Sequence, residues 1–175
     1  MKIKSKRLLI AIMIVVFLLG LFIVFYAYAR ANTIKINPDA TYQITEVVDG
    51  DTIKVRIDRN IAVVRLLGVN TPETVDPRKP PECYGAEASR SMKEFLAGRE
   101  VRLIQDIDRE ITDRYGRYLA YVYLVDGTAV NEWLLTNGLA REYTYGSPYD
   151  FQSRYKELEN IARSAKKGLW GVCDM

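Results

Sequence analysis

The sequence predicts an α+β domain in which about five short strands close into a small barrel capped by three helices, preceded by one N-terminal transmembrane helix. Short β-rich runs bounded by turn residues come early in the soluble part, and helical runs with apolar spacing come later. A long run without charged residues lies near the N-terminus, at residues 8–29. About five short strands bury their apolar faces best by closing on themselves, which favours a barrel.

Three strands are expected first, at residues 42–48, 52–57 and 61–69, where β-branched and aromatic residues gather. Asp49-Gly50-Asp51 joins the first two runs and is typical of a hairpin turn. Four prolines make residues 71–84 a long, stiff loop, and loops of this kind often carry function.

Helices and strands share the rest of the chain. A helix is expected over residues 85–97, because Gly98 suits the position just after its end. The remaining expected elements are strands at residues 101–104 and 118–125 and helices at residues 130–136 and 151–166.

The N-terminal residues 1–30 are predicted to anchor the chain in a membrane. Residues 8–29 hold no charged side chain, and a helix of this length spans about 33 Å, enough to cross a bilayer core. Four cations precede the run, so the positive-inside rule places the N-terminus in the cytoplasm and the rest outside. Signal-peptide cleavage at Ala29 or Ala31 is the alternative and would give a secreted protein.

Charge is unevenly distributed along the chain. Five of the 25 Lys and Arg, and none of the 22 Asp and Glu, lie in residues 1–30, so the remainder carries a net charge of −2. Of that remainder, residues 31–41 are a polar linker and residues 42–175 are the expected folded domain. A polyanion would therefore bind at a local basic site, helped by a divalent metal.

The chain contains no histidine, which excludes a Ser-His-Asp triad, a Cys-His pair and an HEXXH zinc site. Its two cysteines are Cys83 and Cys173. Outside the cytoplasm, an even pair suggests a disulfide, which would close a loop of about 90 residues. Two free thiols are the alternative.

Charged side chains gather around the third expected strand. Asp49 and Asp51 share a face at strand spacing, although Asp-Gly is also a common turn sequence. Alternation along residues 61–69 places Arg65 on one face with the odd-numbered apolar residues. An unpaired guanidinium is energetically unfavourable on an apolar face, so Arg65 needs a carboxylate or a substrate phosphate as its partner. A purely structural ion pair with a nearby acid is the alternative to a functional role.

Two further motifs present charge near turns. Pro72 stiffens the turn that carries Glu73. Residues 113–117 place Arg114 and Arg117 around a glycine turn, and a second arginine in the same cleft would suit a phosphate clamp. A solvated charged loop is the alternative for this second motif.

Residues 49–73 and 113–123 resemble the two sequence signatures of the thermonuclease (staphylococcal nuclease-like) family. Similarity continues through residues 130–140 and the KKGLWG run, so it covers essentially all of residues 42–172. The resemblance implies an OB-fold barrel with three helices, and calcium-dependent hydrolysis of phosphodiester bonds in DNA and RNA. The predicted anchor lies outside the family's domain.

By position, the resemblance implies a Ca²⁺ site. Asp51 matches a direct ligand, Asn70 the second ligand position, and Thr71 a ligand through its backbone carbonyl. Asp49 matches a residue that holds metal-bound water. The family's usual residue at position 70 is Asp, so Asn70 removes one negative charge and is expected to weaken calcium binding.

The resemblance also implies catalytic and substrate-binding residues. Glu73 matches the base that takes a proton from the attacking water. Arg65 and Arg117 match the pair that stabilises charge on the phosphorus. The expected substrate contacts are Tyr115, Tyr143 and Tyr145.

The leading hypothesis is a membrane-anchored nuclease that faces outward, with DNA and RNA as substrates, no protein partner and a monomeric state. A noncatalytic OB-fold that holds nucleic acid is the alternative. Asn70 favours this alternative, whereas a carboxylate base between two arginines opposes it. A module for sugars or protein partners is the third reading.

Overall fold

The computed structural model divides the chain into two compact units, residues 1–35 and residues 36–175. The described backbone covers residues 2–31, 34–74, 80–108 and 110–174. In the N-terminal helix, the described side chains are those of residues 12–26. All described strands lie in the second unit.

The N-terminal unit contains one helix, α1 (Lys2–Ala31), which includes the uncharged run. The described side chains of this helix are exposed. Within the part of the chain that the structure describes, no helix combines the length and apolarity that a membrane crossing needs. The transmembrane span predicted for residues 8–29 reaches beyond those side chains and is not confirmed.

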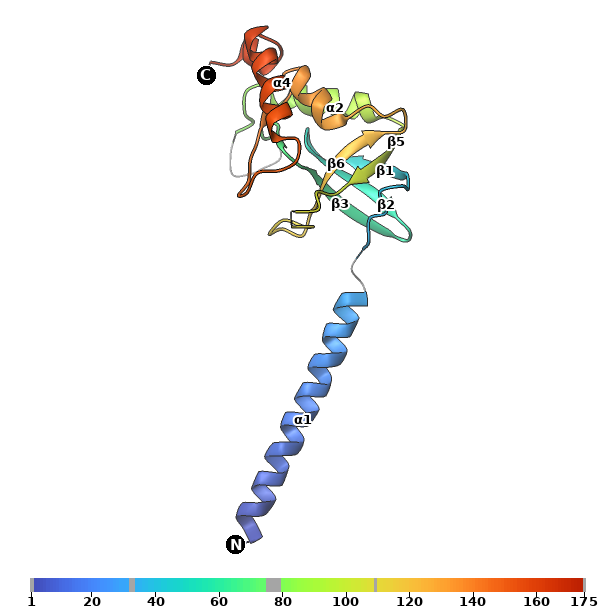
Figure 1. Cartoon of the computed structure of the whole chain (residues 1–175), viewed down its shortest axis with the longest axis vertical. Coiled ribbons are helices and arrows are strands. Elements are labelled where there is room, and N and C mark those ends of the chain that lie inside the picture. Colours follow the sequence, from blue (N-terminus) through green and yellow to red (C-terminus); the bar gives the residue numbers. More distant parts are fainter. Residues whose placement is uncertain (1, 32–33, 75–79, 109, 175) are drawn as a thin grey trace. The chain divides into compact units, whose positions relative to one another are not determined.

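Five strands of the second unit form a closed barrel, as predicted (Figure 1). They are β1 (Tyr42–Val47), β2 (Thr52–Ile57), β3 (Asn60–Leu66), β5 (Glu100–Ile104) and β6 (Tyr118–Leu124). Their order is β1-β2-β3-β6-β5, and β5 pairs with β1 to close the barrel. Neighbours are antiparallel except β3 and β6, which run parallel.

The third expected strand divides at Gly68. β3 ends two residues earlier, and Val69–Asn70 forms a separate strand, β4, that pairs with β7 (Arg141–Glu142). Gly68 has a φ of +78°, and a β carbon there would lie 2.6 Å from the Tyr149 ring. The prediction of one strand over residues 61–69 is therefore wrong beyond β3.

The three expected helices are present, with one further turn near the C-terminus. They are α2 (Gly85–Leu96), α3 (Val130–Thr136) and α4 (Gln152–Ser164), and the further turn is α5 (Leu169–Val172). Helix α2 buries Ala88, Met92 and Leu96, which recur every four residues. Figure 1 shows α2 and α4 gathered at one end of the barrel.

The barrel interior takes the even-numbered face of β3. Ala62, Val64 and Leu66 are at most 1% exposed, whereas Ile61 is 46% exposed. Arg65 therefore lies on the outer face of the barrel with the odd-numbered residues Ile61 and Val63 of β3, and this face is only partly buried. Both faces of this strand are apolar in sequence, so alternation alone cannot decide which of them is buried.

Cys83 and Cys173 form a disulfide, with their Cα atoms 5.9 Å apart. The bond joins the segment before α2 to the end of α5 across a sequence separation of 90 residues. Cys173 packs against a cluster of Ala162, Leu169 and Trp170. A covalent loop of this length stabilises a domain by about 4.6 kcal/mol in the chain-entropy model.

Candidate active site

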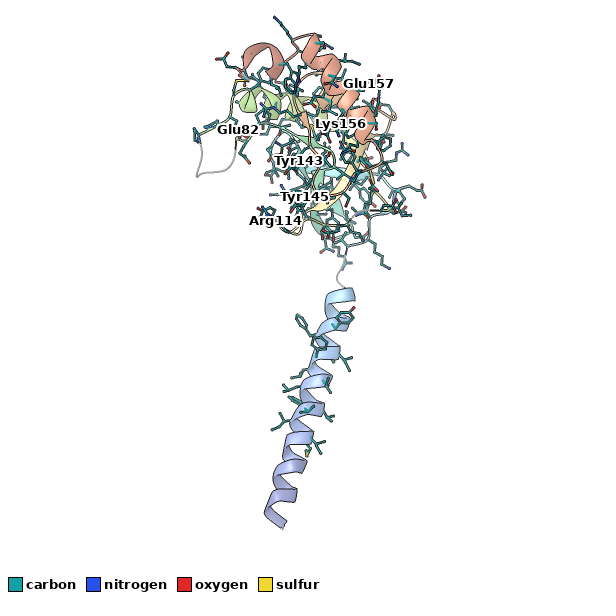
Figure 2. All side chains as sticks on the ribbon, turned by 60° about the vertical axis from the view of Figure 1, so that its left-hand side comes forward. Glu82, Arg114, Tyr143, Tyr145, Lys156 and Glu157 are labelled. Atoms are coloured by element: carbon teal, nitrogen blue, oxygen red, sulfur yellow. A yellow bond between two sulfur atoms is a disulfide. The ribbon has the colours of Figure 1, made fainter. Side chains whose placement is uncertain are left out.

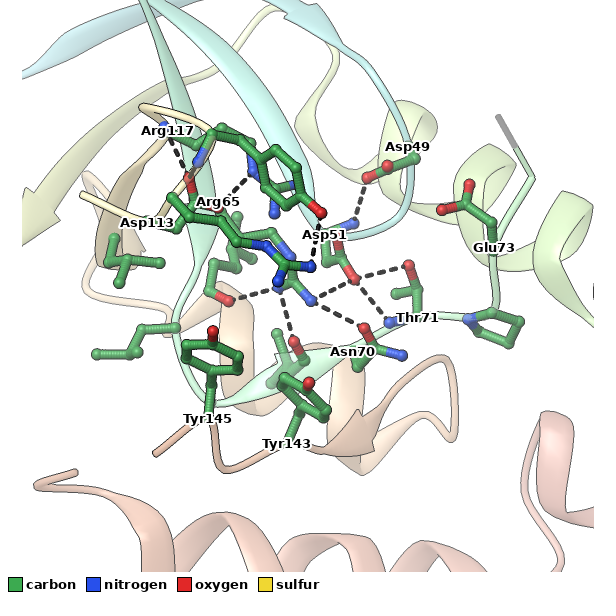
Figure 3. A pocket seen from close by; sticks show the side chains of 18 of the residues that line it. Asp49, Asp51, Arg65, Asn70, Thr71, Glu73, Asp113, Arg117, Tyr143 and Tyr145 are labelled. Carbon is green, nitrogen blue, oxygen red and sulfur yellow. Dashed lines mark hydrogen bonds and ion pairs between the residues drawn. The ribbon is translucent and has the colours of Figure 1, made fainter. Parts of the chain in front are cut away.

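One pocket of about 410 Å³ gathers the ten residues to which the family resemblance gives roles in calcium binding, catalysis and substrate binding (Figure 3). They come from the β1–β2 hairpin, the end of β3, β4 with the chain that follows it, the turn before β6 and the chain after β7. The ten are Asp49, Asp51, Arg65, Asn70, Thr71, Glu73, Tyr115, Arg117, Tyr143 and Tyr145. The barrel thus brings five separate segments of the chain together around one cavity.

Asp51 connects three of these segments and is 5% exposed. Its Oδ2 accepts hydrogen bonds from the Thr71 N–H at 2.8 Å and the Thr71 hydroxyl at 3.1 Å. The same oxygen lies 3.1 Å from Nη2 of Arg65, and Oδ1 accepts from the Thr52 hydroxyl. Gly50 allows this approach, because a β carbon there would lie 2.6 Å from Cγ2 of Thr71.

Arg65 is held against the ends of β3 and β4. Its Nη1 donates to the backbone carbonyls of Leu66 and Val69, each at 2.7 Å. Its Nη2 donates to Oδ1 of Asn70 at 3.0 Å and pairs with Asp51. The guanidinium therefore has the carboxylate partner that its partly buried position requires.

Arg65 and Arg117 become neighbours through the parallel pairing of β3 and β6. Val64 pairs with Tyr118, and Arg65 pairs with Leu119. The turn that carries Arg117 leads directly into β6, and it therefore lies beside the end of β3. A register between strands far apart in sequence is what brings both arginines to one pocket.

Asp113 shapes the turn that carries Arg117. Its Oδ1 accepts from the N–H groups of Tyr115 and Arg117, and its Oδ2 pairs with Nε of Arg117 at 2.7 Å. Burial alone would raise the pKa of Asp113, but the hydrogen bonds from Arg117 and Tyr115 lower it below its usual value. The sequence signal for this role is an Asp that opens a glycine turn.

Asp49 brings a second carboxylate next to Asp51. Its Oδ1 accepts a hydrogen bond from the Asp51 N–H at 3.0 Å. Burial and the adjacent Asp51 charge together raise the pKa of Asp49 to about 6. Two neighbouring carboxylates in a buried hairpin favour a cation beside them.

Exposed aromatic rings form one wall of the pocket. Tyr143 and Tyr145 stack with ring centroids 6.5 Å apart, and the Tyr143 N–H donates to the carbonyl of Gly68. The guanidinium of Arg114 lies 4.8 Å from the ring of Tyr115. Figure 2 shows Arg114 close to the two stacked tyrosines. The guanidinium of Arg117 also lies over the Tyr115 ring, 5.5 Å from its centroid, so both arginines of residues 113–117 contact the aromatic wall.

Glu73 lies where the chain leaves the pocket floor. Its Oε1 accepts a hydrogen bond from the N–H of Thr74 at 2.8 Å. Its own N–H donates to Oε2 of Glu82 at 3.2 Å, and its carbonyl accepts from the Glu82 N–H at 2.9 Å. Glu82 is a residue of the site that the sequence pattern did not single out, because its link to Glu73 depends on the path of the loop.

The side-chain oxygens of Asp51 and Asn70 at the pocket floor are of the kind that bind a hard cation. Oδ2 of Asp51 and Oδ1 of Asn70 both lie within 3.1 Å of one nitrogen of Arg65, so they already converge on a positive charge. Carboxylate and amide oxygens are ligands that calcium accepts. Among the described residues, no group of three or more His, Cys, Asp or Glu side chains is placed to hold a metal.

These features define an OB-fold barrel whose pocket joins arginines, carboxylates and exposed aromatic rings, a combination suited to an anionic ligand with flat rings. Residues 63–172 match the family model described as "Staphylococcal nuclease homologue". The chain belongs to this family.

Three relatives support the same assignment. The chain is 42% identical over 132 residues to the thermonuclease of Staphylococcus hyicus, covering 75% of this chain and 76% of that protein. It is 39% identical over 130 residues to the thermonuclease of Staphylococcus intermedius, with coverage of 74% and 76%. It is 43% identical over 129 residues to the SPbeta prophage-derived endonuclease YokF of Bacillus subtilis (strain 168), with coverage of 73% and 43%. The chain thus spans less than half the length of YokF.

Replacing Asp113 by Asn should change how stability depends on acid. The folded-state pKa of Asp113 is lowered, so its contribution is fully present above the unfolded-state pKa of about 3.9. That contribution disappears as pH falls through the lower folded-state value. Urea unfolding should show a stability gap between wild type and Asp113→Asn at pH 7 that shrinks below about pH 4. A gap that stays constant over this range would contradict the assignment.

Proposed function

We propose that this chain is a calcium-dependent nuclease that hydrolyses phosphodiester bonds of DNA and RNA. One observation carries the proposal: Glu73, Arg65 and Arg117 line the same cavity as the oxygen donors of the pocket floor. The relatives named thermonuclease and endonuclease support the same reaction class. A pocket that only binds nucleic acid has no need of a carboxylate base beside two arginines.

The two arginines would bind the phosphate at the bond to be cut. Guanidinium groups present forked donors that match phosphate oxygens. The ion pair with Asp113 engages Nε of Arg117, and its terminal nitrogens are the donors we assign to the phosphate. Arg65 would exchange contacts with Asp51 and Asn70 for phosphate oxygens. Cations placed in advance stabilise charge that develops on these oxygens in the transition state.

Glu73 would accept the proton of the attacking water. A carboxylate can act as a general base directly or through one intervening water. The chain has no histidine, which supports a carboxylate in this role. The N–H of Thr74 and the contacts with Glu82 orient the side chain and backbone of Glu73 at the pocket wall.

Asp51, Asn70 and the backbone carbonyl of Thr71 would hold calcium, with Asp49 holding water beside it. Calcium bound there supplies positive charge against the phosphate and orients water. Asp51 is already buried and ordered by Thr71, which supports its role as a ligand. The stacked rings of Tyr143 and Tyr145 offer a surface to bases without sequence preference, which supports both DNA and RNA as substrates.

The full chain in a nonionic detergent should cleave single-stranded DNA and RNA when calcium is titrated into the millimolar range. Cleavage should stop when a chelator is added. Folded protein that binds DNA but does not cut it at any calcium concentration would instead support the noncatalytic OB-fold, which the neutral side chain of Asn70 favours.

Glu73→Gln should lower kcat by about 10²–10⁴-fold, because the amide cannot take the proton from water. The affinity for uncleaved DNA should stay close to that of the wild type. Glu157→Gln makes the same change on the exposed surface of α4 and should cut at the wild-type rate. Wild-type turnover by Glu73→Gln would remove Glu73 from the role of base.

Asn70→Asp should bind calcium more tightly, by roughly tenfold, because it restores a negative charge at the ligand position. Titration calorimetry with calcium alone measures this without relying on cleavage. Asn160→Asp adds the same charge to the exposed face of α4 and should leave the affinity unchanged. Equal calcium affinity for Asn70→Asp and the wild type would place residue 70 away from the metal.

We also propose that residues 8–29 hold the chain in the cell membrane, with the folded domain outside the cytoplasm. The 22 uncharged residues and the four preceding cations support this arrangement. The disulfide supports export, because disulfides persist in oxidising compartments.

The full chain should sediment with membranes, and protease added to intact protoplasts should remove its folded domain. A shorter chain in the culture medium, beginning near residue 30 or 32, would show cleavage at Ala29 or Ala31 and a secreted protein. Protection of the domain from external protease would contradict the orientation.

A further inference from the structure

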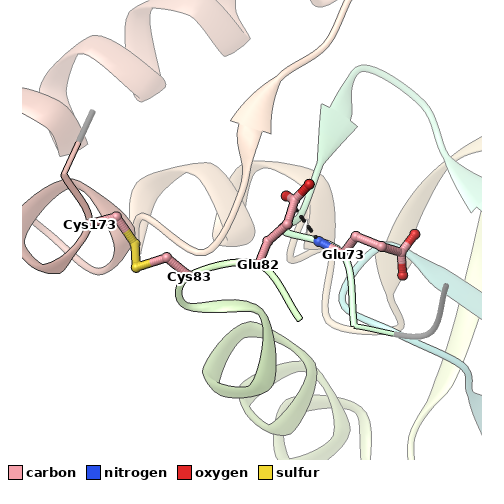
Figure 4. The surroundings of a disulfide bond; sticks show 4 residues. All are labelled: Glu73, Glu82, Cys83 and Cys173. Carbon is pink, nitrogen blue, oxygen red and sulfur yellow. Dashed lines mark hydrogen bonds between the residues drawn. A yellow bond between two sulfur atoms is a disulfide. The ribbon is translucent and has the colours of Figure 1, made fainter. Parts of the chain in front are cut away.

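We infer that the Cys83–Cys173 disulfide and Glu82 together position Glu73, so that turnover depends on the oxidised state of two cysteines outside the pocket (Figure 4). The inference rests on the proposed function, in which Glu73 is the base. Glu82 and the disulfide are positioning groups, since they act through Glu73 and not on substrate.

The first link is a reciprocal pair of hydrogen bonds between Glu73 and Glu82. The Glu73 N–H donates to the carboxylate of Glu82, and the Glu82 N–H donates to the carbonyl of Glu73. Both the backbone and the side chain of Glu82 therefore hold the backbone of Glu73. Any shift of Glu82 is passed directly to the residue that carries the base.

The second link is covalent. Cys83 follows Glu82 directly and is bonded to Cys173. The far end of this bond is well seated, because the Cys173 N–H donates to the carbonyl of Leu169, a residue with no exposed surface. The Leu169 N–H in turn donates to the carbonyl of Gly138. The disulfide thus fastens the Glu82 segment to the packed C-terminal part of the domain.

The third link is the start of α2. Gly85 packs so closely on the chain beside Glu73 that a β carbon there would lie 2.6 Å from Cγ2 of Thr74 and 3.2 Å from the Glu73 carbonyl. Its N–H donates to the carbonyl of Glu82. Tyr84, between Cys83 and Gly85, has a φ of +68°, a conformation that a bulky residue rarely adopts. The covalent bond next to Tyr84 favours this path of the chain.

Breaking the disulfide should therefore release Glu82 and loosen Glu73, while the arginines and tyrosines that bind nucleic acid keep their places. Small errors in the position of a reacting group cost up to about 10²-fold in rate. We expect kcat to fall by about tenfold or more, with KM for DNA little changed. A disulfide that only stabilised the fold would leave kcat unchanged for molecules that remain folded.

The test compares the oxidised full chain, the same chain treated with a dithiol, and Cys83→Ser/Cys173→Ser. The dithiol delivers two electrons and two protons to the S–S bond, giving two thiols, and is itself oxidised to a disulfide. Circular dichroism selects a temperature at which all three remain folded. At that temperature, kcat and KM are measured with single-stranded DNA, and amide hydrogen exchange is measured at Glu73 without calcium or DNA.

Variants of Glu82 test the hydrogen-bonded link with the disulfide intact. Glu82→Ala should lower kcat and speed exchange of the Glu73 amide. Glu82→Gln keeps an oxygen acceptor and should restore much of both. Glu94→Ala removes an exposed glutamate of α2 and should change neither.

Faster exchange at Glu73 and lower kcat after reduction, reversed by reoxidation, would support the inference. Unchanged kcat in the folded, reduced enzyme would overturn it, as would unchanged exchange at Glu73. A chain that never cleaves nucleic acid would defeat the proposed function and, with it, the effect on turnover. The exchange data would still show whether the disulfide holds Glu73 in place.

Discussion

The carboxylate of Asp51 is the contact on which the rest of the pocket depends. It lies in the hairpin between β1 and β2, yet it accepts both hydrogen bonds from Thr71 and the charge of Arg65. A buried carboxylate without such partners would be strongly unfavourable, so these segments are drawn together to satisfy it. The close approach of Gly50 to Thr71 shows how little room is left for another arrangement.

The pairing of the strands brings in the pocket residues that Asp51 does not contact. The parallel pairing of β3 with β6 sets the turn of Arg117 next to Arg65, and the pairing of β4 with β7 sets Tyr143 beside the same pocket. Arg117 and Tyr143 are therefore brought to the pocket by two different strand pairings. The described helices contribute no residue to the lining of this pocket.

Much of this arrangement could be predicted from sequence. Short β-rich runs bounded by turn residues predicted the barrel, and the resemblance of two ordered motifs to the thermonuclease family implied the ten residues that line the pocket. The buried face of β3 could not be predicted, since both of its faces are apolar. The β4–β7 pair could not be predicted either, because a strand of two residues is too short to show an alternating pattern of apolar and polar residues. The role of Glu82 depends on a loop path that composition does not determine.

Arg65 and Arg117 of the pocket are already matched by carboxylates of the same chain, Asp51 and Asp113 respectively. This internal neutralisation limits the electrostatic field that reaches into solvent, and residues 31–175 carry a small net negative charge. Long-range attraction would therefore do little to accelerate the approach of a polyanion. Its capture would depend on short-range contacts, and the rate of encounter would vary only weakly with ionic strength, unlike that of proteins with broad basic surfaces.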